Sequence, residues 1–230
     1  MSGSALKVIA VTSMLIDHIA AYLLVDVNTC QQVWFTVFGE GITLYFLLRM
    51  IGRLAFPLFC FLMVEGYHHT HNKNRYGFQL LMFALLSEIP FDLVNNKEWD
   101  MSSQNVFFTL WLGYCGMRLY SSFREDRLNQ MSSMIIMSVL AFICQADYGL
   151  AGFLFIMLMY AWKTYPCIKV GIGCWLLNSS IMVWMSSWLM TIYDGTRGFI
   201  RTKTAKFAFY AFYPVHLLLI HLIKICHEYF

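Results

Sequence analysis

Apolar runs long enough to cross a membrane recur along most of this chain, and they constrain the fold more than any other feature of the sequence. A hydrocarbon layer about 30 Å thick needs about 20 apolar residues per helix. Inside lipid the protein itself must satisfy every backbone N–H and C=O group, which a helix does within one segment. The sequence therefore predicts an all-α, polytopic membrane helical bundle. About eight transmembrane helices are expected, at residues 5–25, 44–67, 76–94, 105–121, 131–146, 147–163, 167–192 and 206–225.

The amino-acid composition argues against a water-soluble domain. Of the 230 residues, 59% are hydrophobic and 13% are charged, whereas soluble domains have about half and about a quarter. A soluble chain of this composition would have too little polar surface to cover its outside. The net charge of +3 is small and the basic residues are scattered among short loops, so no nucleic-acid partner is expected.

Two apolar stretches do not read as simple spans. Residues 131–162 are interrupted only by a short polar stretch around Asp147, which predicts two short spans joined by a tight turn rather than one long tilted element. The stretch 31–48 is apolar but is broken at its middle by the Gly-Glu-Gly sequence 39–41. An interfacial or re-entrant segment is expected there.

The chain shows no internal repeat, low-complexity tract or linker, so residues 1–230 are interpreted as a single integral-membrane domain. With eight spans, both termini lie on one side of the membrane, and that side carries slightly more Lys and Arg than the other. The positive-inside rule then favours cytoplasmic termini. The basic cluster before the last span, at 197–206, falls on the opposite side in this arrangement.

Asp17 and His18 lie side by side inside the first apolar run. Polar and charged groups are costly within a span, so each is a candidate for function. A neutral imidazole can act as a base, and packing is the structural alternative for His18. Adjacent residues of a helix point about 100° apart, so Asp17 is not expected to orient His18 directly.

Lys7 precedes His18 by eleven residues, close to three helical turns. Both side chains then share one face of the helix, separated by a rise of about 16 Å. A cation at the membrane edge and a deeper imidazole suit the two ends of a phosphate-bearing thioester carrier. A lysine that only anchors the helix at the interface is the alternative.

The second span is followed by a basic, histidine-rich loop, HHTHNKNR. Such a loop suits phosphate binding. Its candidate contacts are His68, His69, Lys73 and Arg75. His68 and His71 have an i, i+3 spacing, but Glu65 is the one acid nearby, so no metal is expected. The seven cysteines include no CxxC pair and most lie in apolar runs, which predicts neither a zinc site nor a disulfide framework.

Glu88 and Asp92 have an i, i+4 spacing near the end of the third span, on either side of Pro90. Paired carboxylates suit acid and base chemistry. They also suit pairing with a buried arginine, and Arg53 is expected at the same depth. Both alternatives stay open at this point.

The polar residues of the spans are expected to gather in one half of the bundle, opposite a mouth marked by Lys7, Glu65 and the histidine-rich loop. This wet half would contain Asp17, His18, Arg53, Glu88, Asp92, Asn105, Asp147, Tyr148, Asp194 and Arg197. The pattern predicts a cavity or tunnel with two entrances. His216, near the centre of the last span, needs a polar partner and is a further site candidate.

Seven segments together resemble the TraX family: LKVIAVTSMLIDHI, IGRLAFPLFCFLMVEGYHHT, ALLSEIPFDL, NVFFTLWLG, ADYGLAG, YDGTRG and FYAFYPVHLLLI. Their order, from Leu6 to about Ile223, makes the match specific. The resemblance implies a transmembrane acyltransferase of the bacterial cytoplasmic membrane. The founding activity of the family is amino-terminal acetylation of a conjugative pilin, and its wider group moves acetyl from cytosolic acetyl-CoA to acceptors at or across the membrane.

The spacing of Lys7 and His18 is similar to the motif of integral-membrane acyltransferases in which ten residues separate a basic residue from a histidine. The resemblance thus implies a catalytic His18 and a Lys7 that contacts the CoA end of acetyl-CoA. Arg53, Asp147 and Tyr148 would position the acceptor or stabilise the oxyanion. The acceptor would be an amine or hydroxyl of a surface glycan, a peptide or a small molecule.

Two other classes of function stay open. In a small transporter, Asp17, His18, Glu88 and Asp92 would form a proton relay across the membrane. In a non-catalytic assembly factor for surface structures, the same residues would serve packing.

Overall fold

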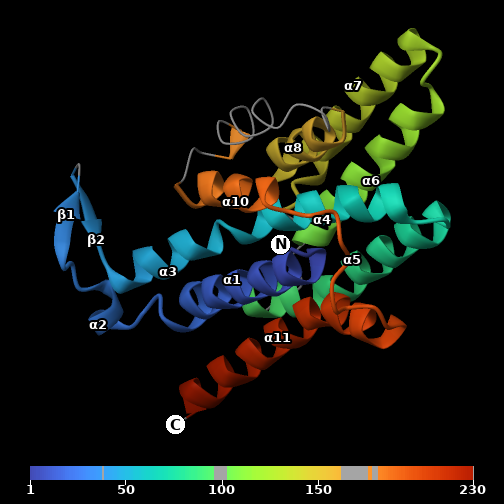
Figure 1. Ribbon diagram of the computed structural model, residues 1–230. Helices are drawn as coiled ribbons and strands as arrows, with labels where there is room; N and C mark the ends of the chain where they lie inside the picture. Colours follow the sequence, from blue (N-terminus) through green and yellow to red (C-terminus); the bar gives the residue numbers. More distant parts are fainter. Residues whose placement is uncertain (38, 96–102, 162–175, 178–180, 230) are drawn as a thin grey trace.

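The computed structural model describes residues 1–37, 39–95, 103–161, 176–177 and 181–229, and most of this part of the chain is helical (Figure 1). The helices of the bundle are α1 (Gly3–Leu23), α3 (Leu44–Gly52), α4 (Ala55–His69), α5 (Lys73–Asn95), α6 (Val106–Ser122), α7 (Arg127–Cys144), α8 (Gly149–Ala161), α10 (Ile181–Thr191) and α11 (Lys203–Tyr229). The predicted class, an all-α polytopic bundle, is confirmed.

Five helical segments of the described residues are long and apolar enough to cross a membrane. They are α1, the segment Leu44–His69 that contains α3 and α4, then α5, α7 and α11. Two further apolar helices, α8 and α10, are shorter. The span expected at 167–192 lies mostly outside the described residues, and α10 forms its last part.

The span expected at 44–67 is interrupted, since α3 ends at Gly52 and α4 begins at Ala55. Pro57 explains the break. It has no N–H to donate to the carbonyl four residues earlier, at Arg53, and its ring would clash with that carbonyl. The proline is instead placed in the first turn of α4, where it is tolerated.

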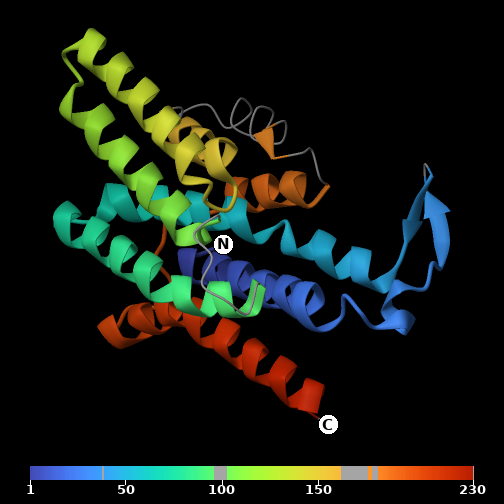
Figure 2. The same cartoon turned by 180° about the vertical axis from the view of Figure 1, so that it is seen from behind.

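The stretch expected at 31–48 as an interfacial or re-entrant segment is not helical at its centre. After the short α2 (Asn28–Gln31), strands β1 (Phe35–Val37) and β2 (Glu40–Ile42) form an antiparallel hairpin. The hairpin projects beyond α3 at the end of the molecule and does not enter the bundle (Figures 1 and 2). Trp34 is exposed there, as suits a residue at a membrane interface.

A tight turn joins α7 to α8, as predicted. Gln145 and Tyr148 both have a positive φ, 48° and 64°, which is uncommon for residues other than glycine. Backbone bonds to the start of the segment before α6 hold the turn, because Asp147 N–H donates to the Gln104 carbonyl at 2.8 Å. The turn therefore sits at a fixed place beside the beginning of α6.

The segment 193–198 lies at the start of α1, and its expected position in the opposite half is wrong. Gly3 N–H donates to the Thr196 carbonyl at 2.8 Å, and the amino terminus lies 3.4 Å from Asp194. These bonds to the first turn of α1 fix the loop. We call this end of the bundle, where α1 and α11 begin and α4 ends, the entrance end.

The two termini lie at opposite ends of the bundle, not on one side as the eight-span arrangement requires. Near the end of α11, Lys224 donates to the Val94 carbonyl at 3.2 Å, and Val94 lies near the end of α5. The end of α1 is there too, because Tyr22 bonds Asn95 at 3.1 Å. We call this the far end.

The outside of the bundle is apolar. On α7, Ile136 and Phe142 are exposed, and on α11 Leu219 and Leu222 are exposed. The interior contains polar side chains, among them buried Asn105. This arrangement is expected in a lipid bilayer, because polar side chains are costly where they face the hydrocarbon layer and are tolerated inside the bundle.

A substitution at Gly52 would test how closely α1 packs against α3. A Cβ at this position would lie 2.1 Å from Oδ1 of Asp17. Gly52→Ala should therefore push the helices apart and cost about 1–3 kcal/mol of stability, measured as a lower unfolding temperature in detergent. At Gly3 an added Cβ meets its nearest neighbour at 3.4 Å, so Gly3→Ala is the matched control. Equal unfolding temperatures for both variants would contradict this packing.

Candidate functional site

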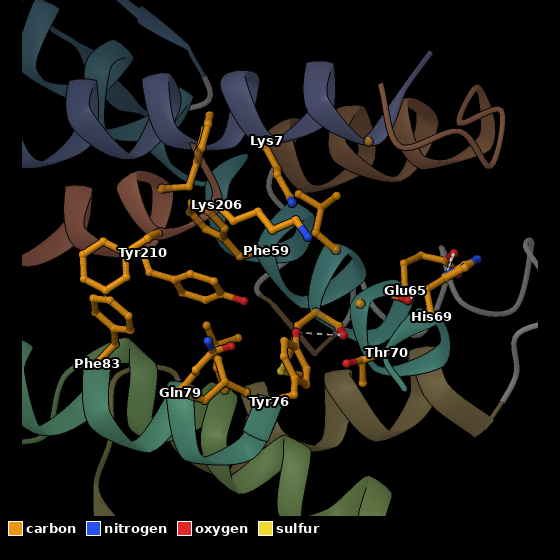
Figure 3. Close-up of a pocket in the computed structure, with 18 of the residues that line it drawn as sticks. Lys7, Phe59, Glu65, His69, Thr70, Tyr76, Gln79, Phe83, Lys206 and Tyr210 are labelled. Atoms are coloured by element: carbon orange, nitrogen blue, oxygen red, sulfur yellow. Dashed lines mark hydrogen bonds and ion pairs between the residues drawn. The ribbon is translucent and has the colours of Figure 1, made fainter. Parts of the chain in front are cut away.

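A cavity of about 1000 Å³ opens at the entrance end between α1, α4, α5, α6 and α11 (Figure 3). Its outer part is mainly basic. Lys7, His69, His71, Arg75, Arg197 and Lys206 line it, together with the acidic Glu65, which lies 3.7 Å from His69. Figure 3 shows Lys7 and Lys206 reaching in from one side and Tyr76 and Gln79 of α5 lining the other. A cavity of this size suits a ligand larger than an amino acid.

The inner part of the cavity is apolar and aromatic and leads toward His18. Met14 and Tyr213 line it. Met14 lies one helical turn before His18 on α1, and the Tyr213 ring meets the His18 ring edge-on with centroids 5.9 Å apart. Lys7 and Met14, on the predicted shared face of α1, line this cavity, and His18 lies one helical turn beyond Met14, outside the lining.

His18 contacts His216 across the interface of α1 and α11. Nδ1 of His18 lies 2.6 Å from Nε2 of His216. Nδ1 of His216 lies 2.7 Å from the Phe212 carbonyl oxygen, one turn earlier on its own helix. The polar partner that His216 needs within its span is thus His18, a pairing that sequence spacing does not reveal.

Asp17 pairs with Arg49 and not with its neighbour His18. Nη1 of Arg49 lies 2.7 Å from Oδ2 of Asp17, and both side chains are partly buried. The absence of a side chain at Gly52 allows this contact. Arg49 was missed as a site residue, although a charge within the apolar run LYFLLRMIGR is the same signal that marked Arg53.

Pairing with Arg53 was one of two alternatives left open for the carboxylates of α5, and Glu88 does not form it. Glu88 instead accepts hydrogen bonds from Asn105, from its backbone N–H at 3.2 Å and from its side-chain amide. Asp92 is buried near the end of α5. Arg53 is exposed at the break between α3 and α4, and its charge acts on Asp147.

Asp147 and Tyr148 occupy the strained turn between α7 and α8. The Thr109 hydroxyl donates to the Asp147 carbonyl, and the Tyr148 ring stacks on Phe56 with centroids 3.7 Å apart. Loss of hydration among the surrounding protein atoms raises the pKa of Asp147 to about 6, although its side chain keeps contact with solvent. Strained backbone at such a position is typical of functional sites.

The residues predicted to bind the carrier divide into two groups. Lys7, His69 and Arg75 line the cavity. The other two face aromatic rings instead: His68 stacks on Tyr160 at 5.3 Å, and the Lys73 ammonium lies 4.3 Å from the centre of the Tyr67 ring. These two contacts hold the loop, and neither His68 nor Lys73 is among the side chains that line the cavity.

Arg197 and Lys206 also line the cavity. From the sequence, Arg197 was expected in the opposite half of the bundle, and Lys206 had no expected role in a site. The loop 193–198 is tied to α1 and carries Arg197 to the entrance end. Lys206 lies in the first turns of α11. No sequence signal links these residues to Lys7, because the link depends on how the last helices return to the first.

Basic side chains are concentrated at the entrance end. Those of the described residues at this end are Lys7, Lys73, Arg75, Arg118, Arg124, Arg127, Arg197, Arg201 and Lys206. The other half of the bundle contains Arg49, Arg53 and Lys224. Among the described residues, no group of three or more His, Cys, Asp or Glu side chains is placed to hold a metal ion.

Comparison with known proteins gives one family and two relatives. The sequence model of the family described as TraX protein matches residues 2–224. The probable fimbrial assembly protein FimC, serogroup H1, of Dichelobacter nodosus is 28% identical over 249 residues, which cover 95% of this chain and 94% of that protein. The uncharacterized protein RP591 of Rickettsia prowazekii (strain Madrid E) is 26% identical over 148 residues, 63% of this chain and 49% of that protein. No solved structure matches the chain.

The pKa of Asp147 gives a prediction that does not depend on function. A folded-state pKa of about 6 lies above the ordinary value of about 3.9 for an unfolded chain. The carboxylate therefore lowers stability above pH 6, and this cost disappears as the pH falls from about 6 toward 4. Asp147→Asn should unfold at a higher temperature than the wild type at pH 7.5 and at a similar temperature near pH 4.

The matched control is Asp26→Asn, an exposed aspartate just after α1, which should change neither temperature appreciably. Thermal unfolding in detergent across this pH range measures both variants. Lower stability of Asp147→Asn at every pH would contradict the raised pKa.

Proposed function

Because the chain belongs to the TraX family, we propose that it is a membrane-embedded acetyltransferase that uses acetyl-CoA. One observation carries the proposal: a single cavity has several cations in its outer part and approaches His18 at its inner part. A donor with phosphates at one end and a thioester at the other requires this polarity. The acetyl group goes to an amine or hydroxyl acceptor at or across the membrane.

The distribution of charge supports a cytoplasmic entrance end. Positive residues are retained on the cytoplasmic side of membrane proteins, and here they are concentrated beside Lys7. The basic cluster at 197–206, which opposed this orientation in the eight-span arrangement, lies at the same end because its loop is bound to α1. Acetyl-CoA from the cytosol would then enter where the cavity opens.

The cavity lining supports the fit of the donor. Lys7, Arg75, Arg197 and Lys206 would contact the phosphates as charge-assisted donors. The eleven residues from Lys7 to His18 correspond to a rise of about 16 Å along α1. An extended donor would thus reach from the basic residues to the imidazole with its thioester inward.

The proposed reaction uses His18 as the base. Its imidazole takes a proton from the acceptor while the acceptor oxygen or nitrogen forms a bond to the thioester carbonyl carbon. The C–S bond then breaks, and the imidazolium returns the proton to the CoA sulfur. In a two-step variant His18 itself carries the acetyl group before the acceptor receives it.

Groups on the far side of His18 would serve the acceptor. Arg53 and Tyr148 can donate hydrogen bonds to an oxyanion, and Asp147 can accept one from an amine or hydroxyl. The ion pair of Asp17 and Arg49 would hold α1 against α3 near this place. The acceptor would be a surface glycan, a peptide or a small molecule.

Two observations bear on the alternative functions. The relative from Dichelobacter nodosus is named as a probable fimbrial assembly protein, which favours a role in surface structures, either by acetylating a component or without catalysis. A proton relay from Asp17 to the carboxylates of α5 is disfavoured, because Asp17 pairs with Arg49 and Glu88 with Asn105. A relay would also need no basic cavity.

The enzyme hypothesis is tested with labelled acetyl-CoA and purified protein in nanodiscs. The wild type should bind the donor and hydrolyse it slowly or pass acetyl to added amines, and His18→Ala should lower this turnover by at least about 10²-fold. Binding should persist in His18→Ala, because the phosphates are held elsewhere. Absence of CoA binding at micromolar concentration would contradict the proposal, and ion flux in liposomes without CoA would favour a transporter.

The basic lining gives a separate prediction on affinity. Lys7→Gln and Lys206→Gln should each weaken CoA binding by about tenfold, since hydrogen bonds to charged groups contribute about 1.5 kcal/mol or more. Calorimetric titration measures the affinity. Lys224→Gln removes a lysine from the far end and is the matched control. A similar loss in all three variants would show that net charge, not the cavity, binds CoA.

A further inference from the structure

We propose that His216 is a positioning residue that fixes the tautomer of His18, so that Nε2 of His18 is the reactive atom. This inference rests on the proposed function, because it names the atom through which His18 would act. His216 is 4% exposed and lies against α1 inside the bundle. A buried imidazole of this kind must have its ring nitrogens satisfied, and its hydrogen bonds determine where its proton is placed.

The geometry of the two rings is that of an in-plane hydrogen bond. The ring planes of His18 and His216 differ by 7°, and their centroids are 4.9 Å apart. Nδ1 of His18 and Nε2 of His216 are 2.6 Å apart. The distance between the two centroids equals the distance between the two nitrogens plus about one ring radius for each imidazole. Both nitrogens therefore lie near the line that joins the centroids. The rings are therefore coplanar and edge to edge, with a ring N–H of one directed at the lone pair of the other.

The backbone decides which nitrogen carries each proton. The Phe212 carbonyl lies 2.7 Å from Nδ1 of His216 and can only accept, so Nδ1 of His216 carries a proton. In the neutral ring Nε2 is then an acceptor. Two acceptors cannot face each other at 2.6 Å, so the proton between the rings belongs to Nδ1 of His18. Nε2 of neutral His18 is thereby left with its lone pair.

This arrangement suits a base in both of its states. When Nε2 of His18 takes a proton, the resulting imidazolium still donates from Nδ1 to His216, and the charge strengthens that bond. The reverse tautomer of His18 would place its lone pair against that of His216 and its proton where the acceptor must lose one. His216 would thus act on the reaction through His18, without touching the substrate.

Aromatic rings on α1 and α11 hold the pair in place. Phe212 lies nearly parallel to His216 with centroids 4.9 Å apart, and Tyr213 meets it edge-on at 5.6 Å. Tyr22 flanks His18 at 5.8 Å. This packing limits rotation of both rings and keeps water from replacing the contact between them.

The tautomer is measured directly by nitrogen NMR of histidine-labelled protein in nanodiscs, with His18→Gln used to assign the signals. In the wild type, His18 should show a protonated Nδ1 and an unprotonated Nε2. In His216→Asn this preference should be lost, because the shorter amide does not reach His18. A protonated Nε2 on neutral wild-type His18 would overturn the inference, whatever the activity of the protein.

Turnover of labelled acetyl-CoA distinguishes positioning from packing. His216→Gln has an amide oxygen that reaches the position of Nε2 and can accept from His18, so kcat should stay within about tenfold of the wild type. His216→Asn should lower kcat by about 10²-fold with little change in CoA affinity. The matched control on the same helix is His221→Asn, a half-buried histidine, which should retain wild-type turnover.

The outcomes separate this inference from the proposed function. If the wild type has the stated tautomer but no acetyl-CoA activity, the proposed function is wrong, while the hydrogen bond from His18 to His216 and its effect on the tautomer are still supported. Equal loss of kcat in folded His216→Gln and His216→Asn would show that acceptance from His18 is not what His216 contributes. Unfolding temperatures of all variants identify any loss that comes from misfolding.

Discussion

Polar side chains inside this apolar bundle must find polar partners, and their pairing determines how the helices pack. An unpaired imidazole or carboxylate in such an interior is costly. His18 and His216 pair where α1 meets α11, and Asp17 and Arg49 pair where α1 meets α3. Both contacts involve consecutive residues of α1. Because consecutive residues point in different directions, α1 is held on two sides and becomes the centre of the candidate site.

The loop 193–198 has an equally strong effect on the organisation of the site. Its carbonyls accept from the first turn of α1, and Asp194 pairs with the amino terminus. The loop thereby brings Arg197 and the start of α11 beside Lys7. Arg197 and Lys206 thus add to the basic residues that α1, α4 and α5 already contribute to the cavity. This contact also places the basic cluster at the same end as the histidine-rich loop, which gives the bundle its clear charge asymmetry.

The strained turn between α7 and α8 is held by contacts from several parts of the chain. Positive φ at Gln145 and Tyr148 is stabilised by bonds to Gln104 and Thr109 and by stacking on Phe56. These contacts come from α4, α6 and the segment before α6, so three parts of the chain hold one short turn. Asp147 and Tyr148 are therefore kept in fixed positions, as the acceptor role that we propose for them requires.

The membrane bundle, the tight turn near Asp147 and the shared helical face of Lys7 and His18 can all be predicted from the amino-acid sequence. These features follow from segment length, turn residues and helical spacing, which are local properties of the chain. The folded arrangement of the helices was needed to show that Arg49 pairs with Asp17, that His216 contacts His18, and that Arg197 and Lys206 line the basic part of the cavity. Each of these depends on which helices become neighbours and at what depth their residues meet. Apolar helix surfaces leave that choice open, and the pairing of buried polar groups then fixes it.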